Sequence, residues 1–165
     1  MSYLRFGAMI AASTVIMYGL MYLNTYQLDH VFYSQTRLWM ALLMGAVMAV
    51  VMLGFMWSMY KNRAANLAIL AGAVVVFAGS LFLVRSQALV GDVDYMRAMI
   101  PHHSIAILTS SHANIRDPRV RELADQIIEA QVREIGEMKT LISDLEANPP
   151  GEGAPMLPSR QTSEP

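Results

Sequence analysis

Three uncharged runs dominate the first half of the chain. They extend over residues 6–23, 38–60 and 67–84, and none contains an acidic or basic side chain. Each run is long enough to cross the hydrocarbon core of a bilayer as a helix, at about 1.5 Å per residue. A backbone in lipid must satisfy its own hydrogen bonds, so each run is expected to be helical. The pattern therefore predicts a membrane domain of three transmembrane helices over residues 1–88.

Basic residues near the ends of these runs predict the orientation. Arg5 precedes the first run, and Lys61 and Arg63 lie between the second and the third, whereas the first loop carries a single Arg37. Short cytoplasmic loops hold an excess of Lys and Arg. We therefore expect a cytoplasmic N-terminus and place everything after residue 85 outside, which in a bacterium means an inner-membrane protein with a periplasmic C-terminal part.

The pattern changes after residue 91 to two charged, amphipathic helices. The first begins at Asp92 or Asp94 and runs to about residue 113. Asp117 followed by Pro118 is typical of a helix start, and the helical pattern then continues to about residue 146. The chain is thus expected to form a helical hairpin over residues 92–147, followed by a tail over residues 148–165. The tail is rich in Pro, Gly, Ser and Glu and is predicted to be disordered.

Polar residues interrupt the apolar faces of both helices of the hairpin. In the second helix Gln131 and Glu134 lie on the inward face, and a buried carboxylate without a partner is costly. The polar candidates on the matching face of the first helix are His102 and His103. The full inward stripe predicted for the second helix is Val120, Leu123, Ala124, Ile127, Gln131, Glu134, Ile135, Met138, Leu141, Ile142 and Leu145.

The spacing of these residues is compatible with a metal site. Met99 lies three residues before His102 and four before His103, so its sulfur shares a helical surface with both imidazoles. The two histidines are about 100° apart on the helix and need not face the same atom. Imidazole and thioether ligands without a thiolate suit copper, and zinc is less natural with methionine sulfur.

A purely structural interpretation competes with the metal site. The histidine pair opposite Glu134 could be a satisfied polar network that fixes the helix register, with Met99 and Met138 as core residues. The remaining histidines, His30 and His112, are expected to be solvent-exposed residues of a loop and a helix end.

Composition excludes several classes of function. The 165 residues include no cysteine, which excludes disulfides and thiolate metal sites. The formal net charge is -1 and no basic stretch is interleaved with aromatics, so nucleic-acid binding is disfavoured. Neither hairpin helix carries the Glu-x-x-His pair of di-iron bundles. No catalytic constellation is found, and we expect the protein not to be an enzyme.

Methionine is unusually frequent, with 14 copies. A four-residue spacing drifts by about 40° per step around a helix, so methionines spaced in this way share no single line, and we interpret them as adaptable apolar packing rather than as a metal pathway. Those of the second run are Met40, Met44, Met48, Met52 and Met56.

Two patterns in the hairpin together resemble a known bacterial family. Residues 99–103 read Met-x-x-His-His, and residues 131–138 read Gln-x-x-Glu-x-x-x-Met. Over about residues 92–145 the chain resembles the family labelled domain of unknown function 305. That family has a ferritin-like helical fold, and some members are periplasmic copper-binding proteins. Many members place a methionine shortly after the histidine pair, where this sequence has Thr109.

By position, the resemblance implies candidate copper ligands at Met99, His102, His103 and Met138, with Glu134 as a ligand or as a partner of one. Because two helices bury little surface, we expect a homodimer that completes a four-helix bundle, or a larger membrane complex. The predicted fold is all-α, with three transmembrane helices followed by a ferritin-like hairpin. The predicted function is copper sequestration or transfer in metal homeostasis. The alternative is a structural or accessory subunit of a membrane complex.

Overall fold

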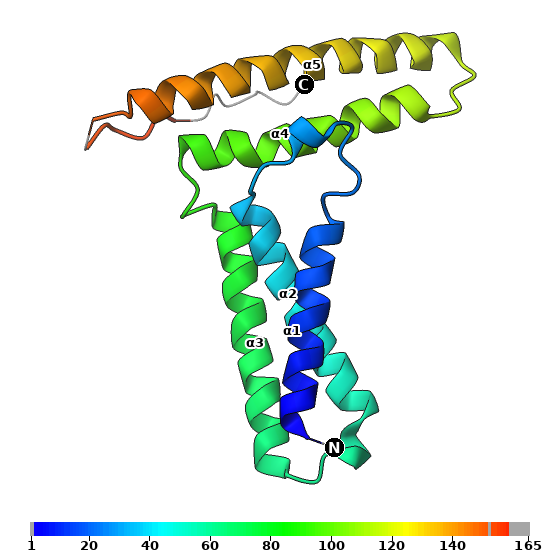
Figure 1. Cartoon of the computed structure of the whole chain (residues 1–165), viewed down its shortest axis with the longest axis vertical. Coiled ribbons are helices and arrows are strands. Elements are labelled where there is room, and N and C mark those ends of the chain that lie inside the picture. Colours follow the sequence, from blue (N-terminus) through cyan, green and yellow to red (C-terminus); the bar gives the residue numbers. More distant parts are fainter. Residues whose placement is uncertain (1, 152, 159–165) are drawn as a thin grey trace.

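The computed structural model describes residues 2–151 and 153–158, and every regular element within them is helical, as predicted (Figure 1). Residue 152 and residues 159–165 of the predicted disordered tail lie outside the described residues. The elements are α1 (Tyr3–Leu20), η1 (Leu28–His30), α2 (Gln35–Phe55), η2 (Trp57–Met59), α3 (Arg63–Ser86), α4 (Asp92–His112) and α5 (Pro118–Ala147).

Four of the five α-helices begin at a residue whose side chain accepts a hydrogen bond from the first turn. The capping residues are Ser2, Ser34, Asn62 and Asp117, at the starts of α1, α2, α3 and α5. Such a cap satisfies one of the backbone N–H groups that a helix start leaves without an intrahelical partner. The exception, α4, follows Gly91 and carries acidic residues in its first turn, where the positive end of the helix dipole favours them.

Helices α1, α2 and α3 form a three-helix bundle that is long and apolar enough to cross a membrane. Helices α1 and α2 approach closely at Gly45, where a Cβ atom would lie 2.4 Å from the hydroxyl oxygen of Thr14. At the end of the bundle near the N-terminus, the hydroxyl of Tyr3 donates to the Asn66 side chain at 2.8 Å, and Asn66 in turn donates to the Tyr60 carbonyl at 2.9 Å. These contacts join α1, α3 and the loop before α3.

The hairpin of α4 and α5 lies across the opposite end of the bundle, so that α4 sits between the bundle and α5 (Figure 1). A core of Met96, Ile100 and Ile107 from α4 meets Ile135 and Ile142 from α5. Helix α4 is continuous through its internal proline, Pro101. Helix α5 is continuous from Pro118 to Ala147. The antiparallel pairing agrees with the pattern read from the sequence.

The buried face of α5 is narrower than the predicted stripe. Ala124, Ile135 and Ile142 are buried, whereas several predicted inward residues remain exposed because α4 covers only one side of α5. The exposed residues are Val120, Leu123, Ile127 and Leu141.

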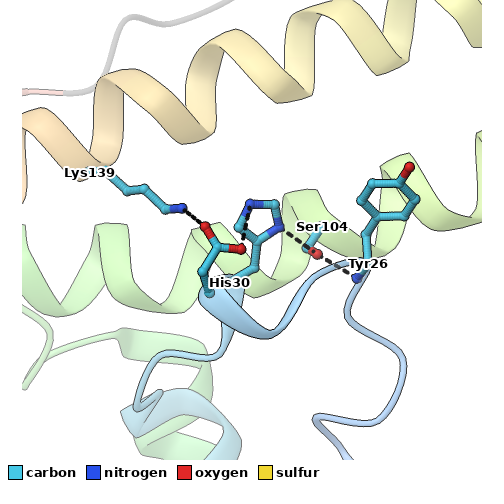
Figure 2. A network of polar contacts seen from close by, with 5 residues as sticks. Tyr26, His30, Ser104 and Lys139 are labelled. Carbon is cyan, nitrogen blue, oxygen red and sulfur yellow. Dashed lines mark hydrogen bonds and ion pairs between the residues drawn. The ribbon is translucent and has the colours of Figure 1, made fainter.

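The loop between α1 and α2 is fastened to α4 by a polar network around the buried side chains of Ser104 and His30 (Figure 2). Ser104 of α4 is fully buried, and its hydroxyl oxygen accepts a hydrogen bond of 2.7 Å from the backbone N–H of Tyr26. The same oxygen lies 3.0 Å from Nδ1 of His30. Lys139 of α5 donates to Asp29 at 2.6 Å, which extends the network to the second helix of the hairpin.

The expectation of a solvent-exposed His30 is therefore wrong. Its side chain is buried between the loop and α4, and this burial lowers the pKa of His30 below its ordinary value, opposed by Asp29 and reinforced by Lys139. A neutral ring is compatible with the hydrogen bonds: the Ser104 oxygen accepts from the backbone N–H of Tyr26, and its hydroxyl can share a hydrogen bond with Nδ1 of His30. Nothing in the local pattern of residues 24–34 indicates this burial, because the covering surface comes from α4.

Replacing Ser104 by alanine is expected to loosen the loop. The change leaves the N–H of Tyr26 and the buried ring of His30 without their partner, which costs about 1–3 kcal/mol. Hydrogen exchange of the amides over residues 24–34 should then accelerate by about tenfold or more in the full-length protein. Ser143→Ala, at an exposed position of α5, is the matched control. Equal protection in both variants would show that the network does not hold the loop.

Candidate metal site

The two adjacent histidines of α4 point to different neighbours. Successive residues of a helix are turned by about 100°, so a helix packed on two sides sends neighbouring side chains to different partners. Ile100 and His103 face α5, whereas Met99 and His102 line a cavity beside the three-helix bundle. The ring centroids of His102 and His103 are 6.2 Å apart.

His103 is paired with the carboxylate that the sequence places on the inward face of α5. Its Nε2 lies 2.9 Å from Oε2 of Glu134, and its Nδ1 lies 3.0 Å from the carbonyl oxygen of Met99. Each ring nitrogen of His103 therefore already lies within hydrogen-bonding distance of an oxygen atom. A metal ion needs a free nitrogen lone pair, so coordination by His103 would require one of these contacts to open.

Met99 and His102 instead face a cavity of about 390 Å³ between α4 and one end of the three-helix bundle. Among the described residues, neither ring nitrogen of His102 has a hydrogen-bond partner. The ring is therefore free to offer a lone pair. Two further methionines line the same cavity, Met21 at the end of α1 and Met40 in the second turn of α2.

The five predicted ligands thus divide into groups. His103 and Glu134 meet between the hairpin helices, Met138 packs against the hydrophobic core there, and Met99 and His102 lie at the cavity. No cluster of three or more His, Cys, Asp or Glu side chains that could hold a metal occurs in the part of the chain that the structure describes. Methionine sulfur is not one of these donor types, so metal binding by Met99, His102 and the other candidates stays a prediction.

The thioether and imidazole donors at the cavity fit a soft metal better than the pair of His103 and Glu134 between α4 and α5 does. Thioether sulfur and neutral imidazole suit copper, and Met favours its reduced ion. Met21 and Met40 were not predicted as ligands, because they belong to apolar runs that packing alone explains. The sequence evidence for a ligand role was limited to their positions, near the ends of the two uncharged runs that border the first loop.

Ser104, His30 and Asp29 form a second polar group that superficially resembles a hydrolytic triad. The hydroxyl of Ser104 contacts His30 at 3.0 Å, and the second ring nitrogen of His30 lies 3.8 Å from Asp29. Ser104 is fully buried and its oxygen already accepts from the backbone of Tyr26, so no substrate can reach it. The group therefore acts as a structural fastening of the loop.

Comparison with known proteins supports the resemblance of the hairpin. A curated relative, the uncharacterized protein L153 of Acanthamoeba polyphaga mimivirus, is 39% identical over 66 residues, which cover 39% of this chain and 43% of that protein. The match thus spans less than half of the relative, and its name assigns no activity. No solved structure matches the chain significantly. The protein joins three apolar N-terminal helices to a C-terminal segment, residues 92–164, that matches the family model Domain of unknown function (DUF305).

Proposed function

We propose that the protein is a membrane-anchored, periplasmic copper-binding protein that sequesters or hands over copper. The observation that carries the proposal is the shared position of Met99 and His102 at one cavity, where no described residue hydrogen-bonds to a ring nitrogen of His102. A free imidazole beside a thioether is a donor pair for copper. His103, Glu134 and Met138 remain candidates that would have to leave their present contacts to bind the ion.

The arrangement of charged residues supports the proposed orientation. Arg5 is in the first turn of α1, and Lys61 and Arg63 lie where the chain passes from α2 to α3. The N-terminus and this connection lie at one end of the three-helix bundle, and the hairpin lies at the other end (Figure 1). Retention of basic residues on the cytoplasmic side would place the hairpin outside. A periplasmic metal site could then collect copper before it crosses the inner membrane.

Copper binding is tested by competition between the full-length protein in detergent and a chromophoric Cu(I) chelator. We expect one copper per chain, and Met99→Leu combined with His102→Gln should lower the affinity by about 10- to 100-fold. His112→Gln, on the exposed end of the same helix, should leave it unchanged. A wild-type chain that fails to compete with the chelator for Cu(I) would contradict the proposed function.

The orientation is tested with single cysteines, because the native chain has none. Ser143→Cys lies on the exposed surface of α5, and Ser58→Cys lies in the exposed turn η2 at the opposite end of the bundle. A membrane-impermeant maleimide applied to intact bacterial cells should label the first and not the second. Labelling of Ser58→Cys alone would place the hairpin in the cytoplasm.

A second candidate function is structural, and the exposed apolar stripe of α5 favours it. Val120, Leu123 and Ile127 are 50%, 57% and 36% exposed and follow the i, i+3, i+7 spacing of a helix-packing seam. Unlike the exposed side chains of α1 to α3, which lipid can cover, this stripe would face water. A second copy of the hairpin would cover it and complete a four-helix bundle.

Native mass measurement of the full-length protein in detergent tests this association. The wild-type chain should be a dimer, and Leu123→Glu should shift it to the monomer because the change buries a charge in the seam. Thr140→Glu, at an exposed position of α5 outside the stripe of Val120, Leu123 and Ile127, is the control that should remain dimeric. A monomeric wild-type chain would leave the stripe without a role in self-association.

A further inference from the structure

We infer that Met21 and Met40 complete a Cu(I) site that is shared between the three-helix bundle and the hairpin. This inference rests on the proposed function and adds to it the oxidation state and the ligands from the membrane helices. Met21, Met40, Met99 and His102 line one cavity of about 390 Å³. Three thioethers and one imidazole provide four soft or borderline donors, a set that favours the reduced ion.

Backbone and side-chain contacts hold the two bundle methionines on the same side of the cavity. Arg37 of α2 donates a hydrogen bond of 2.6 Å to the carbonyl oxygen of Met21, which ties the end of α1 to the first turns of α2. Met40 lies three residues after Arg37, so both share one face of α2. The first loop adds a further tie, because the backbone N–H of Ser34 donates to the hydroxyl of Tyr22 at 3.1 Å.

The hairpin presents its two ligands from the opposite wall. Met99 and His102 are separated by three residues and lie on one face of α4. The network around Ser104 fastens α4 to the first loop, so the position of this wall does not depend on the metal. The four side chains therefore come from three helices whose ends are already joined.

The charges around the cavity discriminate between ions. Within the described chain no carboxylate lines it, and its polar walls include the amide side chains of Asn24 and Gln87. Hard divalent ions require carboxylate oxygens, so Ca²⁺ and Mg²⁺ are disfavoured. Arg37 also lines the cavity, and its guanidinium group lies 4.4 Å from the centre of the Tyr22 ring. Its positive charge repels a divalent ion about twice as strongly as Cu(I) at the same distance.

The test compares two pairs of substitutions in the full-length protein. Met21→Leu combined with Met40→Leu should lower the Cu(I) affinity by about 10- to 100-fold. X-ray absorption at the copper edge should show two fewer sulfur neighbours than in the wild type. Met44→Leu combined with Met48→Leu is the matched control, because both residues lie on α2 but do not line the cavity. Leucine keeps the approximate volume of methionine, so packing is preserved.

The outcomes separate this inference from the proposed function. If Met99→Leu with His102→Gln weakens Cu(I) binding but Met21→Leu with Met40→Leu does not, the hairpin binds copper alone and the shared site is wrong. If the wild-type chain binds no Cu(I), both proposals fail. As an independent readout, Cu(I) should slow amide exchange over residues 24–34 in the wild type, because an ion that bridges the two walls stabilises the docked hairpin. Unchanged exchange on saturation with Cu(I) would also overturn the shared site.

Discussion

The packing of α4 on two sides is the constraint on which the rest of the structure depends. One side meets α5 through an apolar core, and the other meets the end of the three-helix bundle and the loop between α1 and α2. A helix turns by about 100° per residue, so a helix between two partners must divide adjacent side chains between them. The separation of His102 from His103 follows directly. Ser104, one residue further along, is turned again and meets the loop.

Local periodicity was sufficient to predict the five α-helices, although not the short helical turns η1 and η2. Long uncharged runs predicted α1, α2 and α3, and the acid at Asp117 followed by Pro118 predicted the start of α5. These signals are local, because a helix cap or an apolar run depends on residues within a few positions. The pairing of α4 with α5 was also predictable, since a carboxylate on the inward face at Glu134 was expected to meet a polar partner, and Nε2 of His103 lies 2.9 Å from it.

The positions that sequence analysis misjudged depend on surfaces distant in the chain. His30 is buried by a helix that begins more than sixty residues later, and no pattern in a short polar loop reveals that cover. The predicted stripe of α5 was too wide because one neighbouring helix covers only one side of it. The candidate metal site also depends on residues that are distant in the chain. Met99 and His102 were identified from spacing, whereas Met21 lines the cavity only because the hairpin folds back over the end of α1.

The network at Ser104 and the cavity at Met99 both involve α4. Both therefore affect the same equilibrium, in which the hairpin is either packed against the end of the three-helix bundle or separated from it. A site whose ligands come from two bodies binds only in the docked state, and its apparent affinity falls in proportion to the docked fraction. The buried hydrogen bonds of Ser104 keep that fraction high without any metal, so the ion would not have to supply the free energy of docking. Methionine side chains are flexible enough to adjust within such a fixed frame. A rigid junction with adaptable ligands can therefore combine a defined site with release of its ion, which is what sequestration followed by transfer requires.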